Sequence, residues 1–238
     1  MEITFLSVLS LGFILGIKHA VEPDHVIAVS TIASQSKKLW KSALSGVFWG
    51  IGHTATIFIV GIVVILLKGD IPDKWAMSFE FLVGIMLVFL GITSIFSFRN
   101  IHVHKHKHDG DLHKHVHAHP HEKVHHHKHK YQYAPYIKST VIGFVHGLAG
   151  SAAMILLTMS TANTVLEGAI YILVFGAGTI MGMLFFTTII GIPFVLSSKN
   201  LHMNKYLIQS TGVISMVFGF YYMYNLGITE GLFQLWFG

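Results

Sequence analysis

The sequence predicts an all-α polytopic membrane protein, with six transmembrane helices arranged as two inverted three-helix repeats. Three observations lead to this fold class. The 238-residue chain is 53% hydrophobic and only 11% charged, whereas soluble domains are about 25% charged. It contains several apolar stretches of about 20 residues, long enough to cross a bilayer core of about 30 Å. Its first half also resembles its second half.

The six expected spans follow from the apolar stretches along the chain. They cover residues 5–33, 42–67, 79–98, 137–162, 165–193 and 205–225. The connections 34–41, 99–136 and 194–204 carry most of the lysines, whereas the alternate connections and both chain ends are not basic. The positive-inside rule then predicts a cytoplasmic-membrane protein with both termini outside and residues 99–136 in the cytoplasm.

Glycine patterns repeat between the two halves of the chain. The matching positions are Gly12 and Gly16 with Gly143 and Gly147, and Gly84 and Gly91 with Gly212 and Gly219. Three spans per repeat is an odd number, so the second copy must be inverted, a common plan of secondary transporters. We therefore divide the chain into a first repeat with a metal motif (1–98), a His-rich cytoplasmic loop (99–136), a second repeat (137–225) and a C-terminal tail (226–238).

The first span carries an unusual group of ionisable residues, "KHAVEPDH" at 18–25. Ionisable side chains inside a membrane are costly and usually functional. Pro23 removes a backbone donor and clashes with the preceding turn, so the helix should kink or unwind there. Such irregular backbone is tolerated at membrane depth where it lines a cavity or is buried in protein. The break would let side chains on either side of it converge.

The side chains at this break suit a divalent first-row transition metal. Imidazoles with carboxylates favour Ni²⁺, Co²⁺ or Zn²⁺, whereas Ca²⁺ and Mg²⁺ prefer oxygen ligands. The chain has no cysteine, which excludes thiolate sites. The candidate ligands are His19, Glu22, Asp24, His25 and, from the second span, His53. An interhelical hydrogen bond is the alternative role for His53.

Two further regions are candidates for metal handling. In the second repeat, His146, Ser151 and Thr158 could complete a transport pathway. The loop 99–136 has few large apolar residues, so we expect it to be disordered, and its dense imidazoles predict many weak metal sites. A merely solvated basic loop is the alternative. Its histidines are His102, His104, His106, His108, His113, His115, His117, His119, His121, His125, His126, His127 and His129.

Several function classes are disfavoured by the sequence. The net charge of +5 lies in the connections, where it reports membrane orientation, and no nucleic-acid partner is expected. There is no G-x-x-x-x-G-K-[ST] motif for ATP and no H-E-x-x-H zinc-protease motif. The expected partners are the lipid bilayer and a divalent transition metal ion, and a cytoplasmic metallochaperone is retained as a candidate partner.

Three segments resemble the nickel/cobalt transporter family. "HAVEPDH" at 19–25 fits the H-x4-D-H signature of that family, and "GHT" at 52–54 is similar to its second span. The six-span layout and "HGLAGSAA" at 146–153 most resemble its shorter, urease-accessory-type membrane members. The resemblance implies that His19, Asp24 and His25 contribute to metal recognition, followed by Glu22 and His53.

The resulting hypothesis is a secondary transporter, not an enzyme, that moves Ni²⁺ and also Co²⁺ across the cytoplasmic membrane. The metal is the transported substrate, and no resident cofactor is expected. Import is favoured because "EPDH" retains its aspartate, while the His-rich loop resembles that of related nickel/cobalt efflux proteins, which keeps export as the alternative. A His-box membrane metalloenzyme and a metal sensor or metallochaperone scaffold without transport are the remaining hypotheses.

Overall fold

The computed structural model describes residues 5–67, 69, 71–97, 101–108, 111–118, 134–149, 162 and 164–238. Most of these residues are helical. In chain order the helices are α1 (Phe5–His19), α2 (Pro23–Ala33), α3 (Leu39–Leu67), α4 (Asp73–Phe96), α5 (Ala134–Ala149), α7 (Val165–Ser197), α8 (Leu201–Tyr224), the π-helix η1 (Asn225–Thr229) and α9 (Leu232–Phe237).

The predicted membrane-protein class agrees with the length and hydropathy of these helices. Three of them, α3, α4 and α7, are long and apolar enough to cross a membrane, and the bent pair α1–α2 makes a fourth if it is one span. Helix α8 is 24 residues long but begins with a polar stretch. Helix α5 is described for 16 residues, and the rest of the expected span 137–162 lies largely outside the described residues. Six spans therefore remain a prediction.

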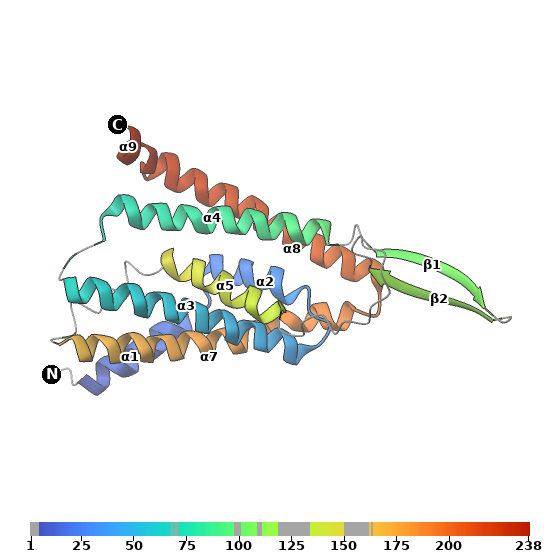
Figure 1. Ribbon diagram of the computed structural model, residues 1–238, viewed down its shortest axis with the longest axis horizontal. Coiled ribbons are helices and arrows are strands. Elements are labelled where there is room, and N and C mark those ends of the chain that lie inside the picture. Colours follow the sequence, from blue (N-terminus) through green and yellow to red (C-terminus); the bar gives the residue numbers. More distant parts are fainter. Residues whose placement is uncertain are drawn as a thin grey trace.

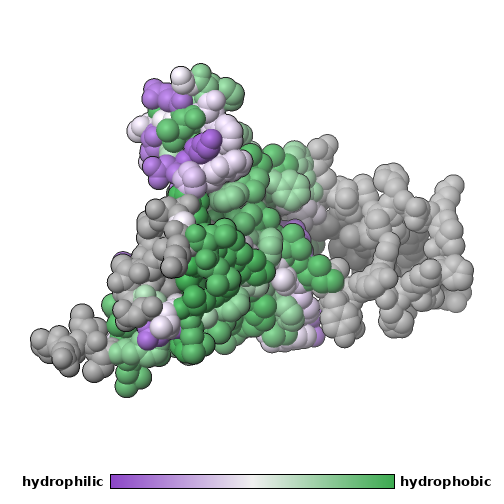
Figure 2. Space-filling view, turned by 60° about the vertical axis from the view of Figure 1, so that its left-hand side comes forward, coloured by the Kyte–Doolittle hydropathy of each residue, from purple (hydrophilic) through white to green (hydrophobic). Residues whose placement is uncertain are grey.

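The surface of the helices is strongly apolar. Large hydrophobic side chains such as Ile14, Phe185 and Val217 are more than half exposed. The face seen in Figure 2 is hydrophobic over most of its described area, and hydrophilic side chains gather near the end that carries the C-terminus. A continuous exposed apolar surface of this extent indicates contact with lipid.

Helices α4 and α8 pack backbone against backbone through paired glycines. A Cβ atom added to Gly91 would lie 2.5 Å from the Gly212 carbonyl oxygen, and one added to Gly212 would lie 2.8 Å from the Gly91 carbonyl oxygen. Gly84 and Gly219 face each other in the same reciprocal way. Small residues allow this close approach of membrane helices. Since the lower-numbered glycine of α4 faces the higher-numbered one of α8, the two helices are antiparallel.

The remaining long helices form two parallel pairs, α1 with α7 and α5 with α3, while α3 packs between α5 and α7 (Figure 1). The direction of each pair follows from its glycine contacts: Gly12 with Tyr171, Gly16 with Phe175, Gly143 with Trp49 and Gly147 with His53. An inverted repeat that exchanges α1 with α5 and α3 with α7 would produce this arrangement. The contacts support the repeat, which stays a prediction.

The His-rich segment differs from the expected disorder. Strands β1 (Ile101–His108) and β2 (Asp111–Ala118) pair in an antiparallel hairpin, with Ile101 opposite Ala118 and His108 opposite Asp111. The physical reason is in the sequence: histidines recur at every second position in both strands, and a period of two is the strand period. Residues 119–133, with six of the loop histidines, lie outside the described residues.

The two ends of the molecule differ in what they carry. The hairpin lies at one end, together with the connections from α2 to α3 and from α7 to α8, and both chain termini lie at the other end (Figure 1). The C-terminal segment is folded onto the start of α4, where the Trp236 indole nitrogen donates a hydrogen bond to Ser78 Oγ at 3.0 Å. The lysine-bearing connections 34–38 and 198–200 are thus on the same side as the His-rich strands.

Candidate metal centre

The first span is broken where the sequence predicts a break. Helix α1 ends at His19, α2 begins at Pro23, and the two helices meet at an angle of 57°. Proline is well suited to the first position of a helix because that position needs no backbone donor. The break therefore brings the last residue of α1 and the first turn of α2, with Asp24 and His25, to one point in the fold.

Four histidines and one aspartate converge at this break, and we call them the histidine cluster. They come from four helices: His19 from α1, Asp24 and His25 from α2, His53 from α3 and His146 from α5. The ring centres of His25 and His146 are 4.0 Å apart, and those of His25 and His19 are 4.4 Å apart. Helix α3 provides His53, whose Nε2 atom lies 3.1 Å from His19 Nε2.

The cluster contains two sets of residues that can each surround one metal ion. The first is His19, His25 and His53, and the second is Asp24, His25 and His146; within each set the donor atoms lie within 4.8 Å of one another. Two donors on opposite sides of a metal at about 2.1 Å would be about 4.2 Å apart. Both sets are therefore close to the dimensions of a coordination shell, and His25 belongs to both.

Carboxylates contact three of the imidazoles, His146 through Nε2 and the other two through Nδ1. His19 Nδ1 lies 2.8 Å from Glu22 Oε2, and His25 Nδ1 lies 3.2 Å from Asp24 Oδ1. A carboxylate accepts but does not donate, so in the neutral rings of His19 and His25 Nδ1 donates its proton and Nε2 retains a lone pair. Carboxylate–histidine pairs of this kind commonly support metal ligands.

The cluster is buried, and several of its polar atoms have no partner. His25, His53 and His146 are each 1% exposed. His25 Nε2, His53 Nδ1 and His146 Nδ1 make no hydrogen bond within the described part of the chain. Leaving buried polar nitrogens unpaired costs free energy. A metal bound through His25 Nε2 would remove one of these costs.

The structure brings some of the predicted site residues together but not all of them. It brings together His19, Asp24, His25 and His53, as expected from the sequence. Glu22 contacts His19 but belongs to neither donor set, and its side chain is 48% exposed. Ser151 and Thr158 lie outside the described residues.

Two residues make contacts within the cluster that the sequence did not predict. His146, expected only along a pathway, has its Nε2 atom 2.7 Å from Asp24 Oδ2. Trp49 was not expected at all: it is fully buried, and its ring stacks at 6.0 Å on that of His25. Trp49 lies four positions before His53, so both are on one face of α3, which is the sequence signal that could have identified it.

One protein-family model matches most of the chain. Residues 5–217 match the family model described as high-affinity nickel-transport protein, NicO. The chain belongs to the NicO family. A NicO protein moves nickel across a membrane, so this chain is a nickel transporter and not an enzyme, as the sequence predicted.

Individual relatives of this NicO protein are found in a bacterium and a plant. The chain is 58% identical over 235 residues to the urease accessory protein UreH of Bacillus sp. (strain TB-90), covering 99% of this chain and 98% of that protein. It is 29% identical over 192 residues to the chloroplast protein FOR GROWTH AND FERTILITY 1 of Arabidopsis thaliana, covering 76% of this chain and 48% of the plant protein. No solved structure matches the chain.

Proposed function

We propose that this protein imports Ni²⁺, with Co²⁺ as a second substrate, across the cytoplasmic membrane, and that the histidine cluster is its substrate site. The observation that carries the proposal is the position of two largely buried donor sets at the break between α1 and α2, sharing His25. Broken helices near the midplane are where secondary transporters bind their substrates.

The spacing of the first donor set supports binding of a dehydrated metal ion. Two nitrogen ligands at right angles around a metal at about 2.1 Å are about 3 Å apart. His19 Nε2 and His53 Nε2 are separated by 3.1 Å, so the two rings require little movement to become neighbouring ligands. Three imidazoles would replace water around Ni²⁺ or Co²⁺, both of which accept nitrogen ligands.

Side-chain exposure decreases from the break toward α5. Glu22 is 48% exposed, His19 is 12% exposed, and His146 is 1% exposed. An ion would meet Glu22 and His19 first and then pass from the first donor set to the second through His25. A negative charge at each stage, Glu22 and then Asp24, offsets the cost of moving a cation into a buried site.

The proposed orientation places both termini outside the cell and the His-rich segment in the cytoplasm. It rests on the lysines at the hairpin end and on the positive-inside rule. The His-rich segment would then receive arriving metal and pass it to a cytoplasmic metallochaperone. The 58% identical relative is named as an accessory protein of an enzyme, urease. Such a role is compatible with a transporter that brings metal into the cell.

The direction of transport is tested by measuring accumulation of radioactive ⁶³Ni²⁺ in bacterial cells that lack their own nickel transporters. Expression of the protein should raise intracellular nickel, whereas an exporter would lower it. Replacing His25 with Ala should return accumulation to the level of cells without the protein. Full transport by the His25→Ala protein would contradict the site assignment but not the family function.

A second experiment separates transport from mere binding. Purified protein in liposomes should take up Ni²⁺ and Co²⁺, and uptake under a set proton gradient would identify the coupling ion. Metal that stays bound to the protein without entering the lumen would indicate a scaffold instead of a transporter. Deleting residues 102–129 should reduce the efficiency of uptake without abolishing it, because the histidine cluster lies outside that segment.

A further inference from the structure

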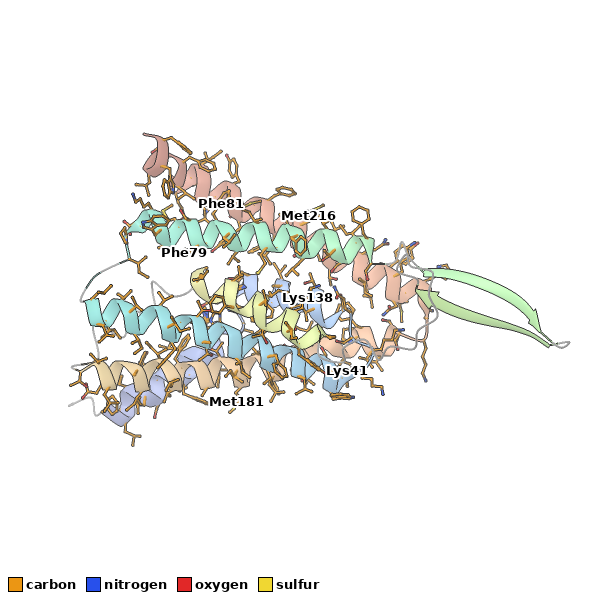
Figure 3. The ribbon with its side chains drawn as sticks, viewed as in Figure 1. Lys41, Phe79, Phe81, Lys138, Met181 and Met216 are labelled. Carbon is orange, nitrogen blue, oxygen red and sulfur yellow. The ribbon has the colours of Figure 1, made fainter. Side chains whose placement is uncertain are left out.

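A second polar site lies away from the histidine cluster, at the hairpin end of the helices. It is a cavity of about 450 Å³ between the end of α2, the start of α3 and the start of α5. Four lysines line it, Lys37, Lys38, Lys41 and Lys138, and we call it the lysine pocket. Figure 3 shows Lys41 on α3 and Lys138 on α5, two elements far apart in the sequence.

Within the described residues, no acidic side chain balances the positive charge of the lysine pocket. None of the residues that line the cavity is acidic, and no ion pair joins these four lysines to a carboxylate within the described parts of the chain. Four ammonium groups around one cavity repel one another. An anion in the cavity would relieve that repulsion.

The helices add further positive potential to the lysine pocket. Two of the elements that line it are the N-terminal ends of long helices, α3 from Leu39 and α5 from Ala134. A helix N-terminus carries a partial positive charge and favours anions such as phosphate. The helix ends and the lysines therefore select for the same kind of ligand.

An exposed tryptophan beside the lysine pocket favours a position near the membrane–water boundary. Trp40, next to the pocket on the first turn of α3, is 55% exposed, and Lys41 Nζ lies 5.7 Å from the centre of its ring. Exposed tryptophans are enriched where the membrane meets water. Basic pockets between membrane helices at this boundary are suited to the anionic head groups of lipids.

We propose that the lysine pocket binds a phosphate group, with the head group of an anionic phospholipid as its source. This site is separate from the metal path, and the proposal does not depend on the direction of nickel transport. Free inorganic phosphate has the same chemistry, so the experiment must distinguish the two sources.

The experiment uses native mass spectrometry of the full-length protein, released from nanodiscs of phosphatidylglycerol or of phosphatidylcholine. The test variant is the double substitution Lys38→Gln and Lys138→Gln. The matched control is Lys199→Gln with Lys205→Gln, which removes two exposed lysines at the same end of the molecule but outside the pocket. Elution as a single species from size-exclusion chromatography checks that each variant is folded. If the double variant does not fold, the single substitution Lys41→Gln replaces it.

The wild-type protein and the control should retain phosphatidylglycerol in preference to phosphatidylcholine, and the pocket variant should bind it at least about tenfold more weakly. Displacement of the retained lipid by millimolar inorganic phosphate would support a phosphate site but overturn the lipid as its source. Equal retention of the two lipids without phosphate binding would overturn the proposal, as would an equal loss in the control variant.

Discussion

His146 Nε2 lies 2.7 Å from Asp24 Oδ2, although the two residues are 122 positions apart in the chain. The contact connects α5 with the first turn of α2 and places one carboxylate between two buried imidazoles, because Asp24 Oδ1 also contacts His25. The two halves of the chain thus meet at the proposed substrate site, and each contributes a donor to it.

Asp24 is expected to be the most sensitive carboxylate of the protein. The Asp24→Asn substitution removes the negative charge from the second donor set and weakens the hydrogen bond that orients the His25 ring. Nickel accumulation should fall by at least about tenfold, measured as ⁶³Ni²⁺ uptake at equal protein levels. The control is Asp73→Asn, at the exposed start of α4, which should transport normally; equal loss in both variants would contradict the role of Asp24.

His146 distinguishes a ligand from a residue that only lines the pathway. If it completes the second donor set, His146→Ala should reduce nickel transport as severely as His25→Ala. His202→Ala replaces an exposed histidine at the start of α8 and should leave transport unchanged. Transport by His146→Ala at near wild-type rate would show that the 2.7 Å contact with Asp24 is structural.

Glu22 should affect affinity more than maximal rate. It holds His19 through Nδ1 but belongs to neither donor set. In Glu22→Gln the half-saturating nickel concentration should rise about tenfold while the maximal uptake rate is largely retained, whereas His19→Ala should abolish uptake. Glu230→Gln, an exposed glutamate outside the cluster, serves as control. A loss of maximal rate without a change in half-saturation would contradict the supporting role of Glu22.

The glycine contacts between α4 and α8 predict a stability effect. A side chain at Gly91 would meet the backbone of Gly212, which cannot rotate away. Gly91→Leu should lower the melting temperature of the purified protein in detergent, since overpacking costs about 1–3 kcal/mol. Gly69→Leu is the matched control, because the nearest described atom to a Cβ added there is 4.0 Å away; a similar melting temperature for both variants would argue against close packing.

The sequence was sufficient for the local features of the site and insufficient for its long-range contacts. Pro23 predicts the helix break because its ring and missing donor act on its own turn, and His19, Asp24 and His25 are near one another in the chain. His146 could be placed only by the packing of α5 against α3, which no local pattern encodes. The His-rich segment carries two opposing local signals: its low hydrophobicity predicts disorder, and its period-two recurrence of histidines favours strands.

The sharing of His25 by both donor sets limits how many ions the protein can hold there. A neutral imidazole offers a metal one lone pair, so the two sets cannot both be complete at the same time. Loading would then be one ion per turnover, without cooperativity between sites. Uptake plotted against nickel concentration should follow a simple hyperbola with a Hill coefficient of about one.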